Sequence, residues 1–189
     1  VILGLAKEAN HLVQGEQDEF EVDGVKGHRD CVIDGVTVDV KSASSMSFQK
    51  FQRGLSPEDD AFGYLDQLKA YVYAGHDDPL VTEKNKGAFL VVDKQHGHIC
   101  LDVHTFSDRE LGRVPGIIEK KKDVVAGPLP DRGFSPVPDG KSGNMKLPVN
   151  CAYCDFKHNC HPNLRTFLYS NGPRFLTRVT RTPDVYEKK

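Results

Sequence analysis

Hydrophobic and polar residues alternate through residues 20–41, and the pair Asp34-Gly35 interrupts the alternation. Alternation of this kind is typical of strands with one buried face. An Asp-Gly pair between two such runs is a strong signal for a two-residue hairpin turn. Counting outward from that turn places Cys31 opposite Val38. The pattern therefore predicts an antiparallel hairpin in which Cys31 is a core thiol.

Helical signals occur in three other parts of the chain, at residues 1–15, 56–75 and 107–125. The first segment ends at a glycine, and the third opens on a capping box and is expected to bend near Pro115. A second hairpin is predicted over about residues 87–103. Residues 42–55 form a polar connection and residues 127–149, rich in Pro and Gly, a long loop. These elements predict an α/β (α+β) fold with a mixed sheet of about four or five strands flanked by helices.

The helix expected over residues 56–75 carries two distinct faces. Gln67 and Tyr71 are four residues apart and share a face with Tyr64. Leu68 and Val72 belong to a neighbouring apolar stripe that is expected to meet the sheet.

The hairpin places unusual chemistry on one face. Because side chains alternate along a strand, Asp30, Asp39 and Lys41 are expected to emerge together. Two carboxylates directly opposite each other repel, whereas Mg²⁺ or Mn²⁺ would turn the repulsion into coordination. Lys41 would then orient a water or stabilise charge developing on a phosphate. The alternative interpretation is a solvated hairpin whose polar face is merely acidic.

Asp30 followed by Asp39-Val40-Lys41 resembles the core motif of the PD-(D/E)XK nuclease superfamily. Gln67 and Tyr71 resemble the Q-x-x-x-Y motif that follows this core in RecB-like nucleases, where it helps to position the DNA. The resemblance implies a restriction-endonuclease-like fold and a metal bound by Asp30, Asp39 and the carbonyl of Val40. It also implies His11 as a further metal ligand, because RecB-like nucleases carry a helical histidine upstream of the first Asp.

A cluster of cysteines lies near the C-terminus, at Cys151, Cys154 and Cys160. It resembles the C-terminal segment of iron–sulfur, Cas4-like members of the same superfamily, in which an upstream fourth cysteine completes a [4Fe–4S] cluster. No cysteine precedes His11, so either the true N-terminus is missing or the site differs. A zinc site that adds His158 or His161 to the three thiolates is the alternative.

Composition agrees with these hypotheses. The chain has 189 residues, 38% of them hydrophobic, and a formal net charge of −2. Such a chain suits one domain, and we expect a nuclease core at 1–126 with residues 127–189 packed on it. There is no secretory signal or membrane-spanning run, so a cytoplasmic protein of a bacterial or phage-infected cell is expected. Contacts to DNA would come from local patches, and Lys120–Lys122 is one candidate.

The sequence therefore predicts a Mg²⁺- or Mn²⁺-dependent deoxyribonuclease. The resemblance favours an exonuclease that acts on DNA ends or single strands in recombination, repair or phage DNA metabolism, with a helicase or recombination partner possible. Two alternatives stay open. One is a sequence-specific endonuclease of the same fold, and the other is a non-catalytic, zinc-containing DNA-binding module.

Overall fold

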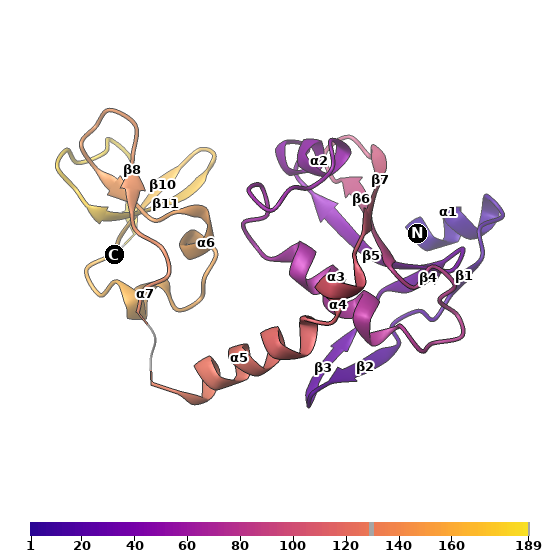
Figure 1. Ribbon diagram of the computed structural model, residues 1–189. Coiled ribbons are helices and arrows are strands. Elements are labelled where there is room, and N and C mark those ends of the chain that lie inside the picture. Colours follow the sequence, from indigo (N-terminus) through magenta and orange to yellow (C-terminus); the bar gives the residue numbers. More distant parts are fainter. Residues whose placement is uncertain (129–130, 189) are drawn as a thin grey trace. The chain divides into compact units, whose positions relative to one another are not determined.

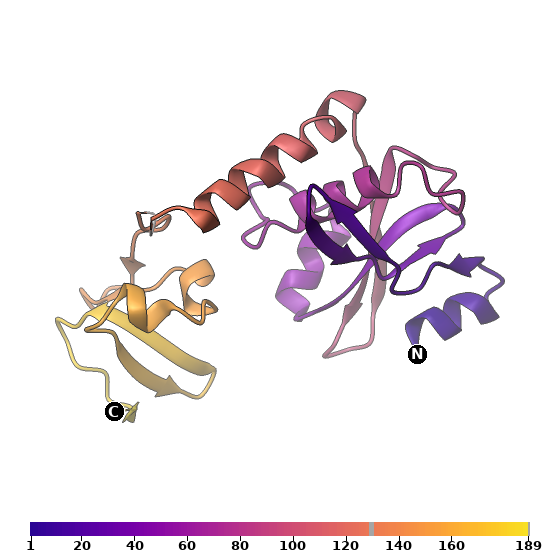
Figure 2. The ribbon, with the colours of Figure 1, turned by 90° about the horizontal axis from the view of Figure 1, so that it is seen from below.

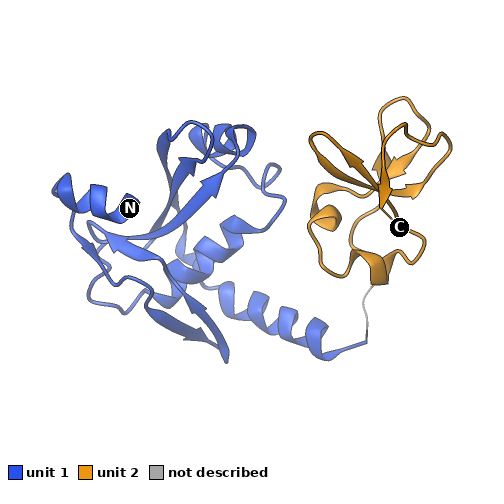
Figure 3. Ribbon diagram, turned by 180° about the vertical axis from the view of Figure 1, so that it is seen from behind, with its two compact units in different colours: residues 1–128 blue, residues 129–189 orange. Residues whose placement is uncertain are grey.

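The computed structural model describes residues 1–128 and 131–188, and the chain divides into two compact units, residues 1–128 and 129–189 (Figure 3). The sequence had predicted that the first of these parts, the nuclease core, would end two residues earlier, at residue 126. In the described ranges, no helix combines the length and the apolar character that crossing a bilayer requires.

Unit 1 is built on a mixed sheet of five strands within residues 1–128, in the order β1-β4-β5-β6-β7 (Figure 1). These strands are β1 (Val13–Gln14), β4 (Cys31–Ile33), β5 (Val36–Ala43), β6 (Lys86–Asp93) and β7 (Ile99–Thr105). β5 and β6 run parallel, whereas the other pairs are antiparallel. The hairpin predicted near residues 87–103 is confirmed as β6–β7.

Helices cover both faces of this sheet (Figure 1). α2 (Ser45–Gln52) and α3 (Tyr64–Ala74) bury one face through a core that includes Leu68 and Val72. α1 (Ile2–Glu8) lies on the other face, where Leu3 packs near Cys31. The unit is therefore an α+β fold with a mixed central sheet flanked by helices, consistent with the expected restriction-endonuclease-like core.

The Asp34-Gly35 hairpin forms as predicted. Asp34 has φ 50° and Gly35 φ 80°, the two positive values that a type I′ turn requires. Cys31 pairs with Val38, Val32 with Thr37 and Ile33 with Val36. A Cβ on Gly35 would lie 1.9 Å from the Thr82 hydroxyl, so the turn also depends on the absence of a side chain there. Cys31 is fully buried, as expected of a core thiol.

The helix predicted over residues 1–15 is wrong beyond Glu8. Asn10 takes a positive φ of 66°, and the backbone N–H of Leu12 donates to the Asp34 carboxylate at 2.9 Å. The chain then enters β1, whose Val13 pairs with Ile33. Val13 and Gln14, which the sequence had assigned to the helix, instead form the edge strand of the sheet.

Two boundaries around α3 also differ from expectation. The polar connection predicted for residues 42–55 contains α2, whose side chains Phe48 and Phe51 are buried. The next helix begins at Tyr64 instead of Pro57, because the Asp60 carboxylate accepts hydrogen bonds from the N–H groups of Tyr64 and Leu65 at 2.9 and 2.8 Å. Its end at Gly75 is as predicted.

The predicted helix over residues 107–125 is divided into two. α4 (Asp108–Leu111) starts from the expected capping box of Ser107 and Glu110, and α5 (Val114–Ala126) follows with Pro115 in its first turn. A separate hairpin of β2 (Glu19–Val22) and β3 (Val25–His28) lies beside the central sheet (Figure 2). A Cβ on Gly27 of β3 would lie 3.2 Å from the Tyr71 ring, so this hairpin packs against α3.

Unit 2 has more regular structure than the sequence suggested. Its described residues form a sheet in the order β12-β10-β11-β9-β8. The strands are β8 (Val137–Pro138), β9 (Met145–Lys146), β10 (Arg165–Tyr169), β11 (Gly172–Arg178) and β12 (Glu187–Lys188). Two short helices, α6 (Val149–Ala152) and α7 (Lys157–Cys160), carry Cys151 and Cys160, and Cys154 lies between them. Phe167 and Leu176 form its buried centre.

Candidate active site

The site is assembled where β4 stops pairing with β5. The last residue pair of that ladder is Cys31 and Val38. Beyond it, the Asp30 carboxylate accepts a hydrogen bond from β5 in place of a backbone carbonyl of β4. Its Oδ2 accepts the backbone N–H of Val40 at 2.7 Å. Asp30 is therefore held against β5 by a main-chain hydrogen bond, which orders its carboxylate beside Asp39.

Asp39 is almost completely enclosed, with 4% of the residue exposed. Burial raises the pKa of its carboxyl to about 6, the Asp30 carboxylate adds to this effect, and the Lys41 ammonium partly offsets it. The Lys41 Nζ lies 2.7 Å from Asp39 Oδ2. This ion pair is the one contact that the structure shows for the buried Oδ2 atom, among the described residues. A buried carboxylate oxygen without a hydrogen bond is costly unless a further cation or donor approaches it.

Lys41 is positioned from three sides. Its ammonium donates to the Gln67 side-chain oxygen at 3.0 Å, and the Gln67 amide donates to the Tyr71 hydroxyl at 3.1 Å. The Tyr64 ring lies beneath the ammonium, with Nζ 4.9 Å from the ring centroid. The face of α3 expected to carry Gln67, Tyr71 and Tyr64 thus meets the sheet at Lys41, and a chain of polar contacts runs from Asp39 to Tyr71.

Two residues that support Asp30 were not found from the sequence. The Gln17 amide donates to Asp30 Oδ1 at 3.0 Å. Arg29, fully buried, pairs with Asp18 at 2.7 Å and with Asp78 at 2.5 Å. A charged residue directly before Asp30 was visible in the sequence, but nothing local indicated that it would be buried or which carboxylates would neutralise it.

His11 lies apart from the two aspartates. Its Nδ1 is 2.7 Å from the Asp34 carboxylate in the hairpin turn, and more than half of its side chain is exposed. Over the described ranges 1–128 and 131–188, no three His, Cys, Asp or Glu side chains are placed as a group that could hold a metal. The structure thus brings Asp30, Asp39, Lys41, Gln67 and Tyr71 together without His11.

The three clustered cysteines lie near one another in unit 2. Burial raises the pKa of the Cys151 thiol, and the charges of Cys154 and Cys160 raise it further. All three are free thiols of intermediate exposure. They supply the right donor chemistry for a thiophilic metal, but within the described residues they are not placed as a ready ligand group.

The two carboxylates of Asp30 and Asp39 repel each other, and a hard divalent cation between them would remove that repulsion. Carboxylate oxygens are the ligands that Mg²⁺ and Mn²⁺ prefer, and Asp39 Oδ2 lacks a hydrogen bond. A cation there would oppose the effect of burial and favour the ionised carboxylate. With a cation held by the two carboxylates, that cation and the Lys41 ammonium would be suited to stabilising negative charge on a bound phosphate.

No protein-family model and no curated protein matches the chain. Among solved structures, the chain is similar to an alkaline exonuclease, LHK-Exo from Laribacter hongkongensis, with 11% identity and a TM-score of 0.42. That alignment covers 66% of each chain, so it spans just under two thirds of the exonuclease. The chain is also similar to a protein named SSO0001, with 17% identity, a TM-score of 0.42 and coverage of 86% of this chain and 69% of the other.

Proposed function

We propose that unit 1 is a metal-dependent DNA nuclease of the PD-(D/E)XK type, with Asp30 and Asp39 as ligands of Mg²⁺ or Mn²⁺. The observation that carries the proposal is the buried Asp39 carboxylate, which lies beside the Asp30 carboxylate and has only the Lys41 ammonium, at 2.7 Å, to offset its charge. Burying this carboxylate costs free energy, and a cation that binds there would recover part of that cost. The Val40 carbonyl is a further proposed ligand, as the resemblance to the PD-(D/E)XK core implies.

The remaining roles follow from the contacts around Lys41. A bound metal would supply Lewis-acid stabilisation of the phosphate and lower the pKa of a water. Lys41 would hold the attacking water in line with the phosphorus atom. Gln67 fixes the Lys41 ammonium at 3.0 Å, and Tyr71 in turn fixes Gln67 at 3.1 Å. In this proposal Gln67 and Tyr71 position Lys41 and lie close enough to contact the DNA backbone.

We propose DNA ends or single strands as the substrate, which the resemblance to RecB-like nucleases supports. The formal net charge of −2 is compatible with this, because the cation bridges acidic side chains to phosphate and no broadly basic surface is needed. Roles in recombination, repair or phage DNA metabolism, with a helicase or recombination partner, belong to the same proposal.

The proposal is tested with end-labelled linear DNA and covalently closed circular DNA, each incubated with and without Mn²⁺. We expect degradation of the linear DNA only, and only with Mn²⁺. Asp39→Asn should remove the activity, whereas Asp77→Asn, a matched change at a fully exposed carboxylate, should not. Cleavage of the closed circle at defined positions would favour a sequence-specific endonuclease. No cleavage of either DNA would leave the zinc-containing binding module as the better interpretation.

We further propose that Cys151, Cys154 and Cys160 bind a metal, either as part of a [4Fe–4S] cluster or as zinc. The spacing of the cysteines supports this, and so does the raised pKa of the Cys151 thiol, to which the charges of Cys154 and Cys160 contribute. Anaerobically purified protein should be brown and contain iron in the first case, and contain about one zinc per chain in the second. Cys154→Ser should lose that metal and Cys31→Ser should keep it. Protein that contains neither metal would contradict the proposal.

A further inference from the structure

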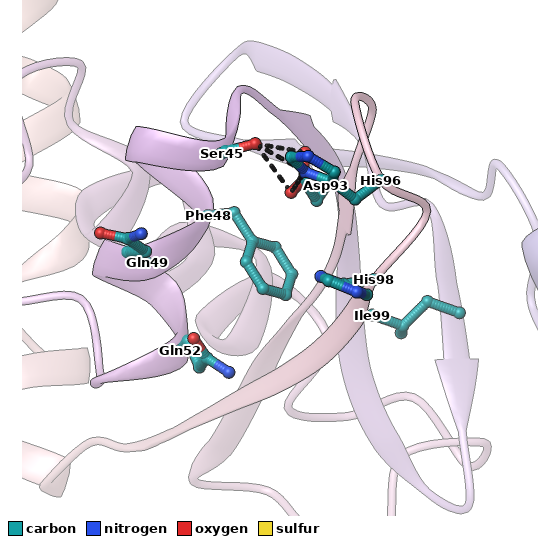
Figure 4. Close-up of a pocket in the computed structure, with 8 residues that line it drawn as sticks. All are labelled: Ser45, Phe48, Gln49, Gln52, Asp93, His96, His98 and Ile99. Atoms are coloured by element: carbon teal, nitrogen blue, oxygen red, sulfur yellow. Dashed lines mark hydrogen bonds and ion pairs between the residues drawn. The ribbon is translucent and has the colours of Figure 1, made fainter.

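A second concave site opens on unit 1, beyond the end of β5, with a volume of about 580 Å³ (Figure 4). One wall is a face of α2, and the other is the turn that joins β6 to β7. The side chains that define its chemistry are Phe48, Gln49, Gln52, Asp93, His96 and His98. None of them belongs to the Asp39–Lys41 site.

The one carboxylate among these cavity side chains, Asp93, is already hydrogen-bonded. Burial raises the pKa of Asp93, but hydrogen bonds from His96, the Gln95 N–H and Ser45 outweigh it and hold the pKa at about 2. Asp93 is therefore ionised and is 2.9 Å from His96 Nδ1. Ser45 Oγ approaches the same ring nitrogen at 3.1 Å, so the imidazole cannot relay a proton from Ser45 to Asp93. This group is not a hydrolytic triad, and its role is to brace the turn.

The ring surfaces and amides of the cavity are suited to a flat, polar, neutral ligand. His96 and His98 are stacked, with centroids 5.7 Å apart and planes at 21°, and Phe48 lies 6.5 Å from His98. Gln49 and Gln52 line the helical wall and supply amide donors and acceptors. No lysine or arginine lines the cavity, which disfavours a phosphate. A nucleobase matches this combination, because it stacks on rings and presents a hydrogen-bonding edge.

The position of the cavity relates it to the candidate active site. Asp39, Lys41 and Ala43 alternate along β5 on the face that α2 and α3 cover, and Ala43 pairs with Asp93 at the end of β6. Four residues of strand separate Asp39 from Ala43, which corresponds to roughly 13 Å. A single DNA strand bound at Asp39 and Lys41 could therefore reach the cavity within a few nucleotides.

We propose that the cavity between α2 and the β6–β7 turn binds an unpaired base of the substrate strand, with His98 as its stacking surface. The inference rests on the proposed nuclease function for the identity of the strand. It adds that the substrate is single-stranded within a few nucleotides of the scissile phosphate. Duplex DNA would have to open over that distance before its strand could occupy both sites.

The test measures binding and does not depend on cleavage. Fluorescence anisotropy in EDTA compares a labelled single-stranded oligonucleotide with one of equal length made entirely of abasic sites. We expect His98→Ala to weaken binding of the normal oligonucleotide about tenfold, as for the loss of one base–ring stack. Both proteins should bind the abasic strand equally. His76→Ala, a change of another exposed imidazole in unit 1, is the matched control and should have no effect.

Four outcomes of the binding test would overturn the proposal. If His98→Ala weakens binding of both strands equally, the residue contacts the backbone, and if it weakens neither, the cavity is not used. An equal loss in His76→Ala would show a general effect of removing an imidazole. A deoxynucleoside monophosphate that competes as well as the oligonucleotide would assign the cavity to a free nucleotide. Absence of Mn²⁺-dependent cleavage would refute the nuclease proposal while leaving the binding result intact.

Discussion

Replacing Asp39 with asparagine preserves the size of a buried side chain and removes its negative charge. Burial raises the pKa of this carboxyl to about 6 in the folded protein, against 3.8 for an unperturbed Asp. Between these two values the folded protein holds a proton that the unfolded chain has released. The free energy of unfolding therefore falls as the pH rises from about 4 to 6, and the loss is complete above pH 6.

The size of this loss follows from the same two pKa values. One pH unit of difference is equivalent to about 1.4 kcal/mol, so a difference of about two units corresponds to about 3 kcal/mol. Without metal, Asp39→Asn should be more stable than the wild type by up to that amount at pH 8 and about equally stable at pH 4. For a chain of this length the gain corresponds to a rise in Tm of roughly 6–12 °C.

A divalent cation should reverse the order. At a concentration of about 100 times its Kd, a ligand that binds only the folded state adds about 2.7 kcal/mol. Mn²⁺ should therefore raise the stability of the wild type by most of the amount that the buried Asp39 charge costs. Asp39→Asn, which has lost one ligand oxygen and the negative charge, should gain little.

The assay is thermal unfolding followed by circular dichroism at pH 4 and pH 8, with EDTA or with Mn²⁺. Asp77→Asn is the control, because its carboxylate is fully exposed and its removal should change neither dependence. Equal Tm values for Asp39→Asn and the wild type at pH 8 in EDTA would refute the argument from burial. Equal stabilisation of both proteins by Mn²⁺ would refute the assignment of Asp39 as a metal ligand.

Three further predictions concern neighbours of this site. Lys41→Ala should abolish cleavage in saturating Mn²⁺ while the protein stays folded, and wild-type rates would exclude Lys41 from catalysis. Tyr71→Phe removes one hydrogen bond to Gln67, so it should lower kcat severalfold and change the free energy of unfolding by about 1 kcal/mol or less. Unfolding without a separate kinetic effect would make Tyr71 a core residue only. Arg29→Met should cost about 3–5 kcal/mol in urea unfolding because it strands the Asp78 carboxylate, and a loss below about 1 kcal/mol would contradict a buried ion pair.

Short-range chemistry accounts for the parts of the fold that were predicted correctly. The Asp34-Gly35 turn has one favoured geometry between right-twisted strands, so it determined the register of β4 and β5. The capping box at Ser107 and the stop at Gly75 are likewise decided within a few residues. The failures lie where tertiary contacts decide the structure.

α2 illustrates the second case. A helix of eight residues is marginal by itself, so its stability comes from packing Phe48 and Phe51 against the sheet. The sheet of unit 2 was missed for a similar reason, since β9 and β12 contain only two residues each and pair with segments far along the chain. Neither packing nor long-range pairing is visible in a local pattern.

The sequence by itself determined which side chains could form the site, because the spacing of Asp30, Asp39 and Lys41 follows from the hairpin and that of Gln67 and Tyr71 from the helical repeat. Only the tertiary structure decided how they meet. It buries Asp39 and lets the Val40 N–H donate a hydrogen bond to the Asp30 carboxylate. It also places the Gln67 side-chain oxygen 3.0 Å from the Lys41 ammonium. Burial and electrostatic coupling depend on every element that surrounds a group, so the raised pKa of Asp39 belongs to the fold and cannot be obtained from the residues one by one.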